Sequence, residues 1–279
     1  MFDWSGRGGA PPDVRPAVMG VVNVTPDSFS DGGRWFGADA AVAHGLALVA
    51  AGADLLDVGG ESTRPGADPV DADAEADRVL PVVARLAAES GVPVSIDTAK
   101  AEVAGAAVAA GARIVNDVTA GRDPDMFGVV ARAGVGFVAM HMQGVPRTMQ
   151  DAPHYDDVVG EVAAFLAARV AAAVAAGVPR AAIAVDPGIG FGKTTAHNLA
   201  LLARLDVLVG SLDVPVVLGT SRKRFLGEIS DSPEPVARDD ATLATTVWAA
   251  ELGVAVVRVH DASGAARVRA LLTAVREAA

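Results

Sequence analysis

The sequence predicts a single-domain α/β fold, the (β/α)8 TIM barrel. Eight times along the chain a short apolar run ends abruptly in a polar or charged residue, and alanine-rich stretches of helical character separate successive runs. The length of 279 residues is close to the ~250 typical of one such barrel. Because the chemistry of these barrels lies where strands end and the next loops begin, the strand ends are also the candidate site residues.

The expected strands are short and do not alternate cleanly between apolar and polar positions, which indicates burial on both faces. In chain order the polar residues that end them are Asn23, Asp57, Asp97, Asn116 with Asp117, His141, Asp186, Thr220 with Ser221, and Arg258 with His260. A doubly wound open sheet is the competing architecture, and it would place ligands mainly at one switch point. Polar residues at almost every strand end favour a closed ring.

Helices are expected between the strands, for example over residues 38–51, 72–89, 158–176 and 240–252. A glycine lies near the end of six helical stretches, where a left-handed residue commonly ends a helix. These glycines are Gly52, Gly91, Gly111, Gly134, Gly177 and Gly253. Residues 1–15, rich in Gly and Pro, are expected to form a flexible N-terminal tail, and residues 16–279 the barrel.

Two loops are long enough to act as lids. Residues 25–37 follow the first strand and contain Asp27 and two adjacent glycines, and residues 59–70 follow the second strand and contain Arg64. Long loops with glycine pivots are candidates for mobile lids, and a plain surface loop is the alternative.

Composition excludes several classes of function. The chain has no cysteine, so disulfides and thiolate chemistry are absent, which is compatible with the cytosol. A net charge of −11 argues against a nucleic-acid partner. No apolar run is expected to reach the ~20 residues of a membrane helix, so no membrane partner is expected. An anionic substrate would need a local positive pocket, and the cations near predicted strand ends are Arg64, Arg222, Lys223, Arg224 and Arg258.

Two segments bear on anion binding. The glycine-rich residues 188–194 look like a phosphate loop, but Pro187 stands where that motif needs its first glycine. His260 lies two residues beyond Arg258, so the two side chains can point the same way, and Asp261 begins a helix whose amides favour an anion. The last strand therefore predicts a diphosphate or oxyanion seat, with a structural salt bridge as the alternative.

Asp97, Asn116 and Asp186 end three separate strands. Buried carboxylates are rarely unpaired, so they bind internal Arg or Lys residues or they read a ligand. A flat heterocycle with adjacent N–H and NH₂ donors presents the same fork to a carboxylate as arginine does, and an amide beside it can donate and accept. With Lys223 nearby, this set suits a nitrogen-rich ring.

Eight segments resemble the dihydropteroate synthase family, and the similarity spans about residues 17–277. The most specific are residues 19–33 (MGVVNVTPDSFSDGG), 57–66 (DVGGESTRPG) and 219–227 (GTSRKRFLG); the others are 95–98, 116–118, 140–144, 186–193 and 258–261. The resemblance implies condensation of a dihydropterin pyrophosphate with p-aminobenzoate, release of diphosphate, a Mg²⁺ cofactor and a cytoplasmic homodimer.

The resemblance also implies a role for each matching residue. The pterin would be held by Asp97, Asn116, Asp186 and Lys223, with Met140 and Gly219 beside it. Mg²⁺ would be bound by Asn23, and the diphosphate would lie near Arg64, Arg258 and His260. The p-aminobenzoate pocket would be formed by Thr63, Pro65, Phe191, Ser221 and Arg222. Asp27, in the loop of residues 25–37 that would close over the site, completes a catalytic set with Arg64, Lys223, Arg258 and His260.

Two other functions remain open at this point. One is a pterin methyltransferase acting on methyltetrahydrofolate, which should lack the Ser221-Arg222-Lys223 block. The other is a non-catalytic paralogue that binds a pterin phosphate.

Overall fold

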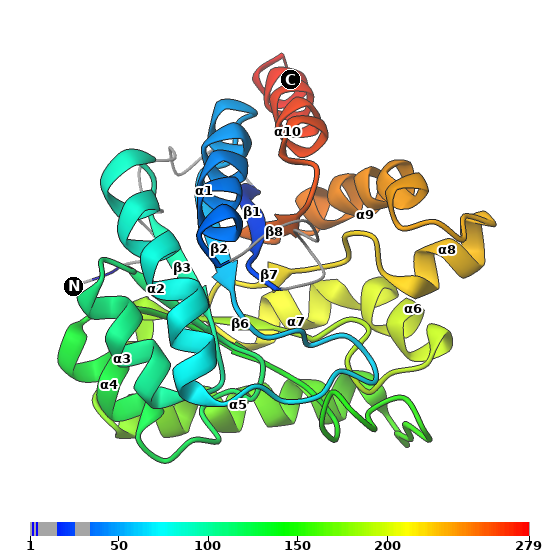
Figure 1. Ribbon diagram of the computed structural model, residues 1–279. Helices are drawn as coiled ribbons and strands as arrows, with labels where there is room; N and C mark the ends of the chain where they lie inside the picture. The colour runs from blue at the N-terminus through cyan, green and yellow to red at the C-terminus, as the bar shows by residue number, and fades with distance from the viewer. Residues whose placement is uncertain (1, 3, 5–15, 26–33, 279) are drawn as a thin grey trace.

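The computed structural model describes residues 2, 4, 16–25 and 34–278 and confirms the predicted barrel. Eight parallel strands pair in the order β6-β5-β4-β3-β2-β1-β8-β7, and the helices surround them (Figure 1). The strands are β1 (Ala17–Asn23), β2 (Leu55–Gly59), β3 (Val94–Asp97), β4 (Ile114–Asp117), β5 (Gly136–Met140), β6 (Ile183–Asp186), β7 (Val217–Leu218) and β8 (Val256–Val259).

The helices in the described parts of the chain agree closely with the expected ones. They are α1 (Arg34–Ala50), α2 (Ala72–Glu89), α3 (Ala101–Ala109), α4 (Met126–Ala133), α5 (Val158–Ala175), α6 (Thr195–Ala203), α7 (Leu205–Ser211), α8 (Arg224–Ser230), α9 (Asp239–Glu251) and α10 (Ala262–Glu277), with short 3-10 turns η3 (Arg180–Ala182) and η4 (Val236–Arg238). All six predicted glycines have positive φ, from 63° at Gly134 to 116° at Gly111, as a left-handed helix end requires.

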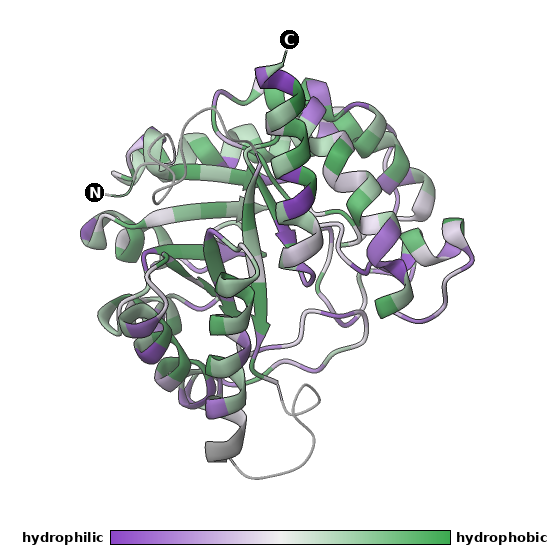
Figure 2. Ribbon diagram, turned by 90° about the horizontal axis from the view of Figure 1, so that it is seen from above, coloured by the Kyte–Doolittle hydropathy of each residue, from purple (hydrophilic) through white to green (hydrophobic). Residues whose placement is uncertain are grey.

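Alternate residues of each strand face opposite sides, which explains the mixed apolar runs. In β2, Leu56 and Val58 pack in the large core between strands and helices, whereas Leu55 joins a separate cluster inside the ring. Figure 2 shows these hydrophobic strands enclosed by helices with hydrophilic residues. Asp57 is an interior position of the same strand, so a carboxylate is built directly above the apolar interior.

The ring closes weakly between β6 and β7. Among the described residues, the pairing at this seam is one isolated bridge between Val185 of β6 and Val216, the residue before β7, with Val185 N–H donating to Pro215 O at 2.9 Å. Pro215 itself has no N–H to donate, which helps to keep β7 at two residues.

The expectation of a free tail over residues 1–15 is wrong for Phe2 and Trp4. Both are buried beneath the barrel interior, and the Trp4 indole donates to Ala182 O at 2.9 Å. Their rings pack edge to face at 5.1 Å, and both join the apolar cluster inside the ring. The rest of that tail and the loop tip at residues 26–33, with Asp27, lie outside the described residues.

One described helix, the 18-residue α5, is long and apolar enough to cross a membrane by length and composition alone. In the fold it is a barrel helix that buries Val162, Leu166 and Val170, and its Arg169 donates to the carbonyls of Ala120 and Gly121.

Candidate active site

An ion-pair network occupies the centre of the barrel mouth. The Arg258 guanidinium donates to Asp57 Oδ2 at 2.6 Å and to Asp97 Oδ2 at 2.8 Å. Asn116 donates to the same Asp57 oxygen at 3.0 Å, which fixes the orientation of its amide. The other oxygen of Asp57 is buried and has no hydrogen-bond partner in the described part of the chain. Four strands are thus tied together around one arginine.

A second group lies across the mouth, at the ends of β6 and β7. Asp186 Oδ1 accepts the Gly188 N–H at 2.7 Å. Its Oδ2, the Lys223 ammonium and the Cβ of Arg258 would each lie 3.8 Å from a Cβ at position 219. The Asp186 carboxylate and the Lys223 ammonium therefore lie close to Gly219, beside the stem of Arg258.

Burial sets the protonation of these groups. The pKa of Asp186 is raised by desolvation, and Lys223 and the Gly188 N–H oppose that rise. The pKa of Asp97 is raised by desolvation and by the negative charge of Asp57, against the effect of Arg258. Desolvation lowers the pKa of Lys223 to about 8. These carboxylates are therefore held in a site where hydrogen-bond donors on a ligand would be strongly favoured.

Ser221 and His260 form a pair at the ends of β7 and β8. The Ser221 hydroxyl lies 2.9 Å from His260 Nδ1 and accepts the His260 backbone N–H at 3.1 Å. The pKa of His260 is lowered to about 3, first by burial and then by Arg258, so the imidazole is neutral near pH 7. Arg64 also contributes to that lowering, which places its charge close to His260. The charge of Arg222 also lowers the His260 pKa, although its guanidinium binds Asp239 in two places.

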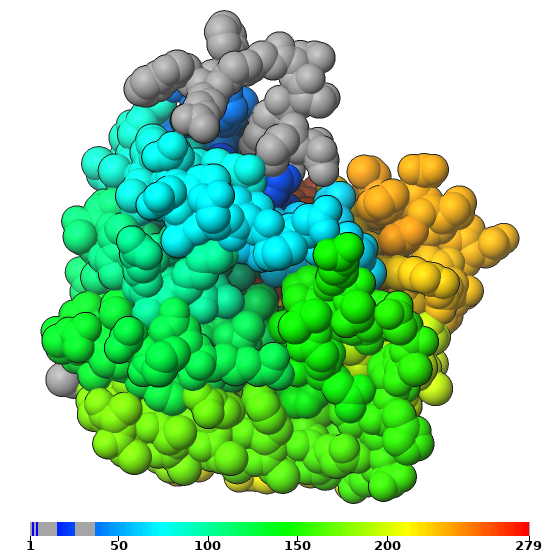
Figure 3. Space-filling view, turned by 60° about the horizontal axis from the view of Figure 1, so that its bottom comes forward, coloured from blue at the N-terminus to red at the C-terminus, as the bar shows by residue number. Residues whose placement is uncertain are grey.

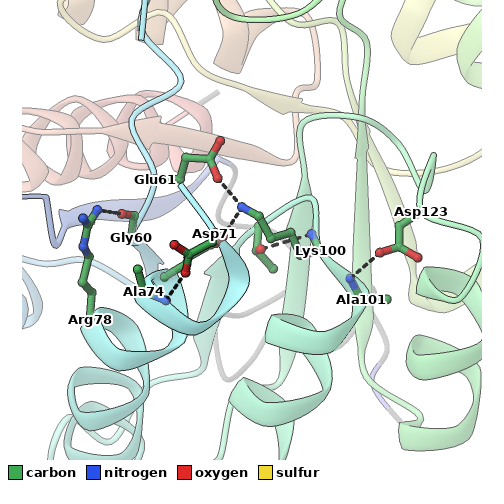
Figure 4. Close-up of polar contacts among 10 residues, drawn as sticks. Gly60, Glu61, Asp71, Ala74, Arg78, Lys100, Ala101 and Asp123 are labelled. Carbon is green, nitrogen blue, oxygen red and sulfur yellow. Dashed lines mark hydrogen bonds and ion pairs between the residues drawn. The ribbon is translucent and has the colours of Figure 1, made fainter. Parts of the chain in front are cut away.

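The loop after β2 is anchored at its base. The Lys100 ammonium binds Glu61, and it binds the fully buried Glu75 of α2 at 2.5 Å, while Arg78 donates to Gly60 O (Figure 4). Further along the loop, Gly66 N–H donates to Pro146 O. Figure 3 shows this segment, in cyan, against the green segment that follows β5, beside a recess facing the gold α8–α9 region. Thr63 is half-buried there, and Arg64 and Pro65 are exposed.

In the glycine-rich segment after β6, backbone carbonyl groups bind Lys193 of the same segment rather than the segment binding a phosphate. Lys193 Nζ donates to Gly188 O at 3.0 Å and Phe191 O at 3.1 Å, and it lies 2.9 Å from His141 Nδ1. Desolvation lowers the pKa of Lys193 to about 7. Lys193 therefore holds this turn together through its hydrogen bonds. The turn places Phe191 against the buried cluster that contains Met140. The Phe191 ring centroid lies 4.8 Å from Lys223 Nζ.

The structure thus brings together most of the predicted set and adds Asp57. Asp57 is identified from the sequence as a strand end and a motif residue, but no role is assigned to it there. Asp57 and Arg258 are 201 residues apart, so no local sequence pattern indicates that they pair. Arg258 was expected near a diphosphate, and the structural salt bridge named as the alternative is present. Asn23 ends β1 beside Gly59, and Asp27 lies outside the described residues.

Comparison with known proteins decides the family. The model of the pterin binding enzyme family matches residues 19–260. The dihydropteroate synthase of Mycobacterium leprae (strain TN) is 53% identical over 251 residues, 88% of each chain. The chain belongs to the pterin-binding enzyme family. The family match begins within β1 and ends at His260, so it contains every site residue described above.

Solved structures similar to this member of the family carry ligands. Xanthomonas albilineans dihydropteroate synthase with 4-aminobenzoic acid superposes with a TM-score of 0.89 at 50% identity, over 95% of this chain and 94% of that chain. The enzyme from the same organism in complex with 7,8-dihydropteroate gives a TM-score of 0.87 at 46% identity, over 97% and 98% of the two chains.

Proposed function

We propose that this chain is a dihydropteroate synthase, which condenses 6-hydroxymethyl-7,8-dihydropterin pyrophosphate with p-aminobenzoate. The observation that carries the proposal is the arrangement of Asp186 and Lys223 around Gly219, next to the Ser221–His260 pair. The relatives support it, because one solved neighbour holds 4-aminobenzoic acid and another holds 7,8-dihydropteroate.

The pterin is held by groups that stay fixed during the reaction. Asp186 Oδ2 accepts from the ring's N–H and NH₂ donors, and Asn116 and Asp97 meet the opposite edge. Lys223 donates to a ring acceptor. Breaking the methylene carbon–oxygen bond releases diphosphate with the bonding electron pair, and the electron-rich ring stabilises the cationic carbon that remains. The neutral arylamine then forms the new carbon–nitrogen bond, and the acidic anilinium proton passes to the released diphosphate or to water, so no strong protein base is required.

The leaving diphosphate meets Arg64 and His260, with Arg258 adding positive charge from its fixed position. Asn23 would bind a Mg²⁺ ion only together with the substrate. Within the described ranges, no group of three or more His, Cys, Asp or Glu side chains could hold a metal ion. Mg²⁺ is commonly bound by one or two protein oxygens plus phosphate oxygens and water, so a single amide oxygen is sufficient. When bound, the ion neutralises diphosphate charge.

The aryl acid lies between the loops. Phe191 and Pro65 supply apolar contacts to its ring, Thr63 and the Arg222 stem flank it, and Ser221 with nearby backbone amides meets its carboxylate. The Arg222 guanidinium is already neutralised by Asp239, so it is the stem that faces the ligand.

A homodimer in the cytoplasm completes the proposal. Large apolar side chains are exposed on outer helices, with Leu199 on α6, Val247 and Trp248 on α9 and Leu271 on α10. Trp248 is 49% exposed although its indole donates to Leu202 O, which links α9 to α6. Light scattering should give a dimer for the wild type and a monomer for Trp248→Glu. Cell fractionation tests the location, which the absence of cysteine supports.

A coupled assay of diphosphate release with both substrates tests the function. Release that depends on both p-aminobenzoate and the pterin pyrophosphate, with 7,8-dihydropteroate found by mass spectrometry, is expected. Tight pterin binding without release would instead identify a non-catalytic pterin-phosphate binder. The intact Ser221-Arg222-Lys223 block argues against the methyltetrahydrofolate-dependent function.

A further inference from the structure

Arg222 has a backbone conformation that side-chain-bearing residues rarely adopt. Its φ is 59°, in the left-handed region, and it stands between Ser221 and Lys223. Ser221 pairs with His260, and Lys223 faces Asp186, so this strained residue sets the separation between the two halves of the site. Such a conformation persists only where the surroundings over-determine it.

The start of α9 supplies those surroundings. The Arg222 N–H donates to the Thr242 hydroxyl at 3.2 Å, and its carbonyl oxygen accepts from Arg238 at 3.0 Å. Its guanidinium donates to both oxygens of Asp239, at 2.8 and 2.7 Å. The Thr242 hydroxyl in turn donates to Arg238 O, so the clamp is a connected network. Backbone and side chain of Arg222 are therefore held from one helix end.

We propose that Asp239 is a positioning residue for the aryl acid. By binding the guanidinium it holds Arg222 in the left-handed turn, and so it keeps Ser221 where the aryl carboxylate docks. The inference rests on the proposed function. If the clamp is loosened, only a fraction of molecules has the competent turn, and the apparent affinity for the aryl acid falls by that fraction.

The chain offers a matched control in Asp240. Both residues are acidic and lie in the first turn of α9, but Asp240 is exposed and Asp239 binds Arg222. Loss of favourable charge at the helix N-terminus is common to Asp239→Ala and Asp240→Ala. Any effect confined to Asp239→Ala therefore comes from the contact with Arg222.

Two readouts on the full-length protein test the proposal. Asp239→Ala should raise KM for p-aminobenzoate about 5- to 20-fold with kcat and the pterin dissociation constant within twofold of wild type, because saturating aryl acid restores the competent turn. Amide exchange of Arg222, measured by NMR, should quicken by about the same factor. Asp240→Ala should change neither, and Asp239→Asn, which keeps one acceptor, should be intermediate.

A double-mutant cycle with Arg222→Gly tests whether Asp239 acts through Arg222. Glycine lacks the guanidinium that Asp239 binds and adopts positive φ without strain, so adding Asp239→Ala to Arg222→Gly should change KM less than twofold. Equal effects of Asp239→Ala and Asp240→Ala, a fall in kcat with constant KM, or a full Asp239 effect in the glycine background would each overturn the proposal. If the wild type makes no product, the proposed function fails, and the exchange measurement still decides whether Asp239 holds the turn.

Discussion

In the proposed function, the pterin half of the site lies on strand ends, whereas the aryl-acid half lies on loops. Asp186 and Asn116 are 5% and 7% exposed and are held by neighbouring strands, but Arg64 and Pro65 are exposed on a long connection. The groups of the first half are buried and fixed by strand pairing. A ligand of the second half depends on loops held by a few side-chain anchors. We therefore expect the pterin to bind first and the aryl acid second.

The largest expected effect is in the strand-end half. Asp186→Ala removes the acceptor for the ring's donors in a dry pocket, which costs roughly 3–5 kcal/mol, or at least about 10²-fold in pterin affinity. Calorimetric titration with a pterin analogue measures it. An unchanged dissociation constant would assign Asp186 a purely structural role and would contradict the proposed difference between the two halves of the site.

Asp57→Ala should show that the same half also stabilises the fold. It takes one carboxylate from Arg258 and the acceptor from Asn116, so the free energy of unfolding should fall by about 3 kcal/mol. Urea denaturation measures the loss. Asp57→Asn keeps the shape and an acceptor and should lose less; equal stability of wild type and Asp57→Ala would mean that Asp97 alone satisfies Arg258.

The loop half should separate binding from stability. Glu61→Ala frees Lys100 from the base of the loop after β2 but leaves its contact with Glu75. We expect KM for p-aminobenzoate to rise about 10-fold, with an unfolding free energy within about 1 kcal/mol of wild type, as for a partly exposed ion pair. Asp68→Ala, an exposed change in the same loop, is the control. A matching loss of pterin affinity would show that the halves are not independent.

The smallest effect concerns acid stability. The pKa of His260 falls from an ordinary 6.5 to about 3 in the folded protein, by burial and Arg258. Between these values the unfolded chain binds the proton and the folded chain does not, so stability falls as pH drops below 6.5. His260→Asn should remove on the order of 1 kcal/mol of that loss at pH 5.5. Unfolding curves at pH 7.5 and 5.5 measure it; identical pH dependence would show that His260 is not the group involved. His141, with its pKa also lowered to about 3, still contributes in the variant.

Regular features of the fold were predictable because they follow local rules. Glycines at helix ends and polar residues at strand ends are visible in the sequence, and α2 was located to the residue. The pairing of Arg258 with Asp57 was not predictable, because parallel strands far apart in sequence meet only when the ring closes. The contacts that hold Arg222 were not predictable for a similar reason. Positive φ at an arginine has no sequence signature, and the contact between Arg222 and α9 is visible only in the folded structure.

One isolated bridge joins Val185 of β6 to Val216, the residue before β7, so we expect the barrel to open most readily at this seam. The adjacent pairs β5–β6 and β7–β8 have four and two register pairs that must separate together. Asp186 lies on one side of the seam, and the Ser221–Lys223 turn lies on the other. We therefore expect local opening between Asp186 and Lys223, the two residues that hold the pterin in the proposed function, and bound pterin should bridge the seam and oppose that opening. Amide protection along β7 should rise on pterin binding more than along β3.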